Sequence, residues 1–240
     1  MLRQILKTLA ALAFAALLLF TLLYNGIIWF TDIHAWRYQV RGVDVSNYQG
    51  EIDWTVLAGQ GIDFAFIKAT EGSTFQDKKF GYNLAQAYET DLRVGAYHFF
   101  SYDSSGETQA ENFINTVPKL DNLLPPVIDI EFYGDKDHNP PSRQQTESIL
   151  RPLLETLEEH YGKKPIIYAV EKSYDLYISG DYQEYPIWIR DVIEKPVLSD
   201  GRQWTFWQYC ARKTLKGYKG EERFIDMNVF AGSLEELMAM

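Results

Sequence analysis

Two carboxylates, Asp129 and Glu131, stand two positions apart at the end of a short apolar run that begins with Pro125 and Pro126. Branched apolar residues bounded by prolines predict a buried strand. Side chains alternate between the two faces of a strand, so both carboxylates share one face, roughly 6–7 Å apart along the backbone. Two carboxyl groups at about this separation divide the work of hydrolysing a glycosidic bond. The alternative is a pair of surface acids, because D-x-E alone is a weak motif.

Two further aspartates, Asp44 and Asp226, lie near the C-terminal ends of other predicted strands. Barrel enzymes carry their catalytic groups at that end of the strands. In a closed barrel the first and last strands are neighbours and the fourth lies across the mouth, so four carboxylates would converge on one opening. Crowded like charges raise the pKa of at least one of them. A protonated acid then stands beside ionised partners, as general acid catalysis on a leaving sugar oxygen requires.

The elements that position these acids alternate between strand and helix patterns. Such βα units imply a parallel sheet, and eight strands suggest closure into a barrel. Only the first five strands are followed by helices, so we predict an irregular TIM-like α/β barrel with eight strands and about five helices. The predicted strands are residues 41–46, 64–69, 93–100, 125–131, 165–169, 185–190, 204–209 and 223–228. The predicted helices are residues 54–58, 78–90, 104–117, 142–161, 171–178 and a last one at 233–238.

Size and composition narrow the function classes. A chain of 240 residues with 46% hydrophobic content suits one barrel domain. The formal net charge of −10 disfavours nucleic acid as a partner. One cysteine, Cys210, excludes an internal disulfide and a cysteine-based zinc site. The histidines show no ligand spacing and no phosphate-binding glycine loop is visible, so we expect no metal and no cofactor. We also expect a monomer.

An uncharged apolar run covers residues 9–30, preceded by Arg3 and Lys7. As a helix, about 22 residues span roughly 33 Å, enough to cross a bilayer. The positive-inside rule then keeps the N-terminus in the cytoplasm. The alternative is a cleaved signal peptide, for which the run is long and lacks a close A-x-A site. The predicted organisation is a cytoplasmic N-terminus (1–8), a transmembrane anchor (9–30), a linker (31–40) and an extracytoplasmic, periplasmic or extracellular, barrel domain (41–240).

Aromatic side chains crowd the predicted strand ends, where sugar rings could stack on them. Core packing is the alternative for each of these residues, and a lone histidine is more often structural than catalytic. Phe99, Phe100 and Phe206 are assigned to the core. The candidates for the cleft are Tyr97, His98, Tyr168, Trp188, Trp207 and Tyr209.

Six short motifs follow one another in a specific order: Gly42-Val43-Asp44-Val45-Ser46, Tyr97-His98-Phe99, Asp129-Ile130-Glu131, Trp188, Trp207-Gln208-Tyr209 and Ile225-Asp226-Met227-Asn228. In this order and spacing they resemble glycoside hydrolase family 25, the CH-type lysozymes. The resemblance covers about residues 41–231 and implies an α/β barrel with eight strands and five helices. It also implies hydrolysis of the β-1,4 bond from N-acetylmuramic acid to N-acetylglucosamine in peptidoglycan.

Carried onto this sequence, the resemblance makes Glu131 the general acid and gives Asp129, Asp44 and Asp226 supporting roles. It implies retention of anomeric configuration, with the substrate's acetamido group as nucleophile and Asp129 orienting it, a recognised exception to the two-carboxylate scheme. One departure is Ile189-Arg190-Asp191 after Trp188, where the family usually has small and aromatic residues. The substrate-binding residues implied are Tyr97, His98, Tyr168, Trp188, Trp207, Gln208 and Asn228.

Two other functions compete with this interpretation. The first is a glycosidase for another N-acetylated polymer such as chitin, for which a D-x-D-x-E strand would be expected. Residue 127 is Val instead of Asp. The second is a catalytically silent module that holds cell-wall glycan in an aromatic cleft, and the intact Asp129 and Glu131 argue against it.

Overall fold

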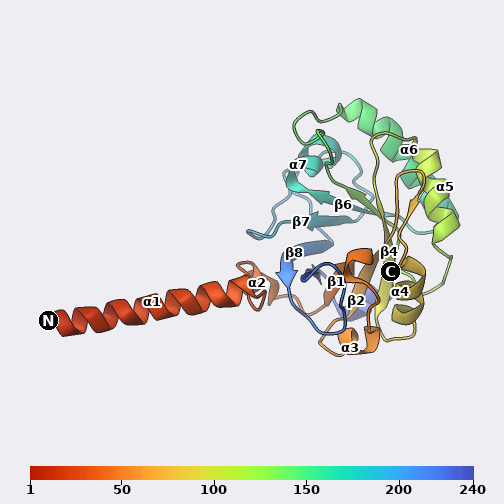
Figure 1. Ribbon diagram of the computed structural model, residues 1–240. Coiled ribbons are helices and arrows are strands. Elements are labelled where there is room, and N and C mark those ends of the chain that lie inside the picture. The colour runs from red at the N-terminus through yellow and green to blue at the C-terminus, as the bar shows by residue number, and fades with distance from the viewer.

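Eight strands close into a barrel in the computed structural model, which describes residues 1–240 (Figure 1). The order around the barrel is β1-β2-β4-β5-β6-β7-β8-β9, and β9 returns to β1, so the predicted fold class is confirmed. A two-residue strand, β3 (Phe75–Gln76), extends the end of β2 outside the closed ring. The barrel strands are β1 (Arg41–Val45), β2 (Phe64–Glu71), β4 (Arg93–Phe99), β5 (Val127–Ile130), β6 (Ile166–Val170), β7 (Ile187–Arg190), β8 (Phe206–Lys213) and β9 (Ile225–Phe230).

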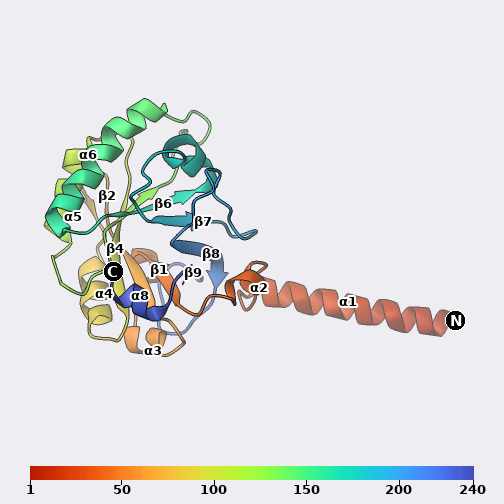
Figure 2. The same cartoon turned by 180° about the vertical axis from the view of Figure 1, so that it is seen from behind.

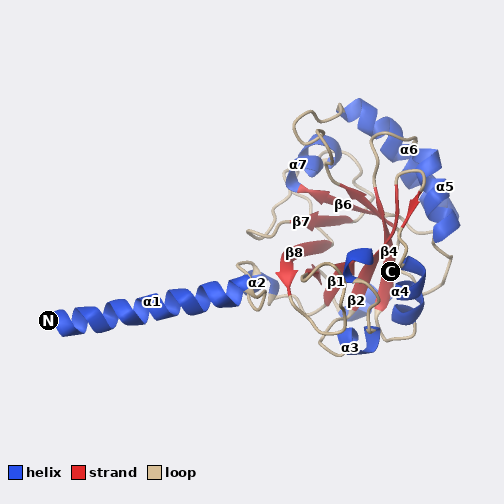
Figure 3. Ribbon diagram, in the orientation of Figure 1, coloured by secondary structure: helices blue, strands red, loops and turns tan.

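Helices follow the first five barrel strands, as the sequence predicts, and pack outside the sheet (Figure 3). The longest begins at a capping box formed by Ser142 and Gln145 and ends at Gly162, which adopts a left-handed conformation. A short π-helical turn continues α7. The helices are α3 (Trp54–Ala58), α4 (Phe80–Tyr88), α5 (Gly106–Thr116), α6 (Arg143–Tyr161) and α7 (Glu171–Ser173), with α8 (Leu234–Met238) after β9.

Strand β9 runs antiparallel to both of its neighbours, β8 and β1. The sequence prediction placed Asp226 near the C-terminal end of its strand, but Asp226 is the second residue of β9. Because β9 runs the opposite way, its N-terminal end meets the C-terminal ends of the parallel strands. Asp226 is therefore in register with Asp44 of β1. Asp226 therefore joins the other carboxylates as predicted, but from the N-terminal end of its strand.

Alternating residues of β2 fill the barrel from its floor to its mouth. Phe64 and Phe66 belong to the apolar cluster inside the barrel, whereas Lys68 lines the opening above them. Glycines on the neighbouring strands make room for the two rings. A Cβ atom on Gly42 would lie 2.3 Å from the Phe64 ring, and one on Gly95 would lie 2.5 Å from the Phe66 ring. The floor is therefore filled by aromatic packing, and the cleft that contains the carboxylates lies at the opposite end.

Helix α1 (Leu2–Tyr24) projects away from the barrel and buries none of its residues (Figures 1 and 2). With 23 residues, the helix is long and apolar enough to cross a membrane, a test that a signal sequence also passes. The helix starts and stops earlier than the predicted segment 9–30. It ends before Gly26, which has a φ of +67° and where an added Cβ would lie 2.0 Å from the backbone oxygen of Arg212.

Residues 25–40, called the collar below, pack against the outside of β8 and include the short helix α2 (Asp32–Ala35). The hydroxyl of Thr31 is fully buried and donates a hydrogen bond to a backbone carbonyl of β8. The carboxylate of Asp32 pairs with the ammonium of Lys213. The segment predicted as a linker is thus part of the folded domain, and the base of α1 is attached directly to the barrel.

Candidate active site

An open cleft at the carboxyl ends of the parallel strands contains all four predicted catalytic carboxylates: Asp44, Asp129, Glu131 and Asp226. It encloses about 380 Å³, within the range of about 300–1,000 Å³ that small-molecule pockets occupy. Its aromatic lining consists of Tyr48, Tyr97, Phe99, Tyr168 and Trp188. Acidic and aromatic side chains therefore share one opening, as the sequence analysis expected.

Asp129 lies inside the barrel, and its carboxyl oxygen Oδ1 is buried without a hydrogen-bond partner. Burial raises the pKa of Asp129 well above its usual range, and the nearby charge of Glu131 raises it further. The ammonium of Lys68 opposes this shift in part. Glu131 follows β5 at the mouth of the cleft and is only half-buried. The pair therefore offers one enclosed carboxyl with a free oxygen and one accessible carboxyl.

Asp44 is held by two side-chain amides that converge on its Oδ1 atom, from Asn228 at 2.7 Å and Gln208 at 2.9 Å. The carbonyl oxygen of each amide accepts a hydrogen bond from an aromatic donor. Trp188 Nε1 donates to Asn228 at 2.8 Å, and the hydroxyl of Tyr168 donates to Gln208 at 2.9 Å. Because indole is a donor only, it fixes which end of the Asn228 amide faces Asp44. The network thus holds Asp44 in one position.

The carboxyls of Asp44 and Asp226 interact directly. Burial raises the pKa of Asp44 to about 6, opposed by the hydrogen bonds from Asn228 and Gln208. Burial and the charge of Asp44 raise the pKa of Asp226 well above its usual range. Asp226 therefore binds its proton more tightly than an exposed aspartate does, and the titrations of the two carboxyls are linked.

The structure corrects the prediction that His98 and Trp207 contact substrate. His98 is next to the cleft residue Tyr97 in its strand, and Trp207 is next to Gln208. Because successive side chains of a strand point to opposite faces, both point outside the barrel. His98 is fully buried between Thr70, at 2.7 Å, and Gln109, at 3.0 Å, and burial lowers its pKa to about 4. Trp207 is fully buried and donates to the carbonyl of Asp191 at 2.7 Å. Both residues are structural.

The same alternation sorts the remaining candidates. Tyr97, Tyr168, Trp188 and Gln208 line the cleft, whereas Tyr209 packs in the outer core and Asn228 lies fully buried beneath Asp44. Asn228 therefore positions Asp44 instead of touching a ligand. Phe99, which the sequence analysis assigned to the core, belongs to the cleft wall.

Lys68 is a cleft residue that the sequence analysis missed. Its ammonium lies 4.9 Å from the centre of the Phe99 ring and 2.9 Å from a carboxylate oxygen of Glu71. Two-residue periodicity from Phe64 and Phe66 could have identified it, since all three side chains share one face of β2. Lys68 supplies a positive charge close to Asp129.

The charged pair after Trp188 separates into two different roles. Arg190 lines the cleft, takes part in none of the ion pairs, and lowers the pKa of Asp226 by its charge. The side chain of Asp191 accepts hydrogen bonds from the backbone N–H groups of Ile193 at 2.9 Å and Glu194 at 3.0 Å, in the loop after β7. Arg190 is thus a cleft residue, and Asp191 caps the loop that follows.

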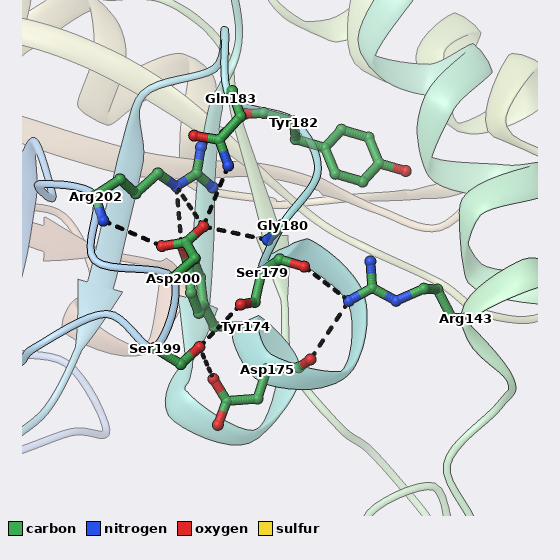
Figure 4. Close-up of polar contacts among 10 residues, drawn as sticks. All are labelled: Arg143, Tyr174, Asp175, Ser179, Gly180, Tyr182, Gln183, Ser199, Asp200 and Arg202. Carbon is green, nitrogen blue, oxygen red and sulfur yellow. Dashed lines mark hydrogen bonds and ion pairs between the residues drawn. The ribbon is translucent and has the colours of Figure 1, made fainter.

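That loop, residues 191–205, joins β7 to β8 without a helix, as predicted, and a polar network holds it (Figure 4). Asp200 accepts hydrogen bonds from the hydroxyl of Tyr174 at 2.8 Å and from the backbone of Gly180 at 3.2 Å. Arg202 Nε donates to the same tyrosine oxygen at 2.8 Å. These contacts attach the loop to the π-helical turn after α7. They hold the connection in place where other barrel strands are followed by a helix.

Comparison with known proteins agrees with this geometry. A sequence model described as glycosyl hydrolases family 25 matches residues 43–218. The chain belongs to glycoside hydrolase family 25. It is therefore a glycoside hydrolase, and its barrel is the family's catalytic domain.

Three relatives illustrate the similarity. The solved structure of a family 25 glycosyl hydrolase from Bacillus anthracis is 57% identical, with a TM-score of 0.81, covering 85% of this chain and 94% of that one. The bacterial lysozyme from Streptomyces coelicolor is 32% identical, with a TM-score of 0.73, covering 83% and 95% of the two chains. Lysozyme M1 from Streptomyces globisporus is 31% identical over 217 residues, 84% of this chain and 71% of that protein.

The buried carboxyls predict a characteristic pH dependence of stability. The pKa of Asp44 is about 6 in the folded protein against 3.8 for an unperturbed aspartate, so the folded state holds its proton longer. Stability present at acidic pH is therefore lost as pH rises through about 6, and the loss amounts to roughly 3 kcal/mol. Chemical denaturation of the detergent-solubilised protein from pH 4 to 8 should show this decline in wild type and a flatter profile in Asp44→Asn. Glu155→Gln, at an exposed position on α6, controls for the loss of one charge, and equal slopes in wild type and Asp44→Asn would contradict the assignment.

Proposed function

We propose that this glycoside hydrolase is a lysozyme that cleaves the β-1,4 bond between N-acetylmuramic acid and N-acetylglucosamine in peptidoglycan. Relatives named as lysozymes, from Streptomyces coelicolor and Streptomyces globisporus, support this substrate class. The observation that carries the proposal is the pair at the end of β5. Glu131 is accessible at the cleft mouth, and beside it Asp129 has a buried oxygen without a partner.

In the proposed mechanism Glu131 is the general acid. It gives its proton to the glycosidic oxygen as the bond to the anomeric carbon breaks, so the departing sugar leaves as a neutral alcohol. Positive charge then develops on the sugar ring. Asp44, fixed by its two amide donors, supplies a positioned negative charge that stabilises it.

Asp129 orients the nucleophile, which is the acetamido group of the substrate. The amide N–H donates to the unpartnered Oδ1 atom of Asp129, and the amide carbonyl oxygen attacks the anomeric carbon. The resulting oxazolinium nitrogen is positively charged, which favours the ionised form of Asp129 despite its raised pKa. Water then opens this ring with Glu131 acting as base, and the configuration is retained.

Replacing Glu131 by Gln keeps the shape of the side chain and removes its transferable proton. General acids contribute about 10²–10⁴-fold, and a sugar leaving group requires the upper end of this range. We therefore expect folded protein with almost no clearing of a purified cell-wall suspension. Glu155→Gln should clear walls at the wild-type rate. More than about a tenth of wild-type activity in Glu131→Gln would remove this residue from the acid role, and wild-type protein that binds walls without lysing them would point to a silent binding module.

The substitution Asp129→Asn tests the nucleophile. The asparagine side chain carries no negative charge that could stabilise a positively charged oxazolinium nitrogen. Turnover should therefore fall while glycan binding persists. No sugar–enzyme adduct should be seen by mass spectrometry in wild type or variant, because the nucleophile belongs to the substrate. An adduct trapped on Asp129 would instead make this residue the nucleophile.

We also propose that α1 anchors the enzyme in a membrane with the barrel on the extracytoplasmic side. Three features support this: the helix is apolar, it buries no residue, and Arg3 and Lys7 lie at its start. A cell-wall substrate also lies outside the cytoplasm. The attached collar keeps the barrel close to the end of α1, so the enzyme would act on glycan near the membrane.

Fractionation tests the anchor. Full-length protein should remain in the membrane fraction after a carbonate wash, because a run this rich in Leu and Phe inserts readily. A shortened chain should begin at Asn25, because a start near Tyr38 would remove packed collar residues. It should be soluble and still clear walls. Soluble mature protein with an N-terminus near Trp36 would identify the segment as a signal peptide.

A further inference from the structure

The most exposed large apolar side chains after residue 24 gather in two segments. Their exposed fractions run from 56% for Ile27 to 89% for Val197, and every other large apolar residue after α1 is at most 51% exposed. Four lie on the collar and two on the loop between β7 and β8. The six residues are Ile27, Phe30, Ile33, Trp36, Ile193 and Val197.

The two segments are in direct contact and form one face of the barrel. Trp29 of the collar donates its Nε1–H to the carbonyl of Val192 in the loop at 2.6 Å. The ammonium of Lys195 lies 5.8 Å from the ring of Tyr38. Both views of the molecule show this loop reaching toward the side from which α1 leaves the barrel (Figures 1 and 2). We call this surface the collar face.

The backbone beneath the exposed side chains of the collar face is firmly attached to the barrel. On the collar, the buried Thr31 and the ion pair of Asp32 attach the backbone to β8. On the loop, Pro196 and Leu198 are buried on either side of the exposed Val197. The network around Asp200 holds the C-terminal part of this loop (Figure 4). Apolar side chains are therefore held outward by a firmly attached backbone.

We propose that the collar face lies on the bilayer and places its apolar side chains in the interfacial layer. This rests on the proposed membrane anchor. The path of the chain indicates that a bilayer covers this face, because α1 leaves from the same face and the collar attaches the base of α1 to the barrel. A bilayer that contains α1 must bring its surface to these residues. Exposed Arg37 and Lys195 flank the apolar side chains, as expected for contact with anionic headgroups in a chain of net charge −10.

This placement determines where the cleft opens. The guanidinium of Arg212 lies 6.0 Å from the ring of Trp29 on the collar. The same arginine lines the outer part of the cleft together with Asp44 and Asp226. One side chain thus separates the membrane-facing collar from the catalytic carboxylates. The enzyme would hold its glycan alongside the bilayer in a fixed orientation, instead of sampling the wall freely on a tether.

Fluorescence depth measurements on the full-length protein test this proposal. The native Cys210 has no exposed surface, so single cysteines can carry an environment-sensitive fluorophore at Ile33→Cys, Val197→Cys, Leu12→Cys and Glu155→Cys. The protein is reconstituted into vesicles of phosphatidylethanolamine and phosphatidylglycerol that carry spin-labelled lipids. Labels at 33 and 197 should emit at shorter wavelength than the label at 155 and be quenched by spin labels near the headgroups. The label at 12 should be quenched by spin labels deep in the acyl chains, and the label at 155 by neither.

Each other outcome has a distinct meaning. If the label at 12 is quenched while those at 33 and 197 behave like the one at 155, the anchor stands and the collar-face proposal is wrong. If the label at 12 is not quenched, the anchor itself is wrong and the collar-face proposal falls with it. Quenching at 33 without quenching at 197 would also overturn the proposal, because the loop would then not belong to the membrane-facing surface.

Discussion

Four carboxylates share the mouth of one barrel, and the electrostatic cost of that crowding shapes the site. Two amide donors offset it at Asp44, and the cations of Lys68 and Arg190 offset it on either side. The buried Oδ1 atom of Asp129 receives no hydrogen bond. The fold therefore maintains one under-solvated carboxyl, and the proposed mechanism places the substrate amide beside it.

The barrel makes this possible because its lower half is filled by aromatic rings. Phe64 and Phe66 close the floor opposite Gly42 and Gly95, and Trp188 supports Asn228 from within. Water is excluded beneath the carboxylates, so the hydrogen bonds to Asp44 act in a low-dielectric environment where they are stronger. The same burial raises the pKa values of the aspartates. The strong hydrogen bonds to Asp44 and the unfavourable burial of carboxylate charge therefore have one physical cause.

The N-terminal segment bears on where the cleft is held, because the collar joins α1 to the barrel. A flexible linker would let the barrel move freely about the end of α1, whereas the collar packs against β8 and holds the barrel close to that end. The loop between β7 and β8 lacks a helix, reaches toward the side from which α1 leaves, and carries two of the most exposed apolar residues. A departure from the regular barrel therefore coincides with the surface proposed to meet the bilayer.

Periodicity along the chain was enough to predict the order of strands and helices, the closed barrel, the apolar N-terminal helix and the convergence of Asp44, Asp129, Glu131 and Asp226. These follow from local alternation and from the chain order of the motifs. Only the tertiary structure decided strand direction and facing. The antiparallel course of β9 brings Asp226 to the rim from its other end. The face that each strand turns inward places His98 and Trp207 outside the barrel and Phe99 in the cleft. The packing of the collar also depended on contacts nearly 180 residues apart, such as Thr31 with Tyr209, because pairing across such separations leaves no local pattern in the sequence.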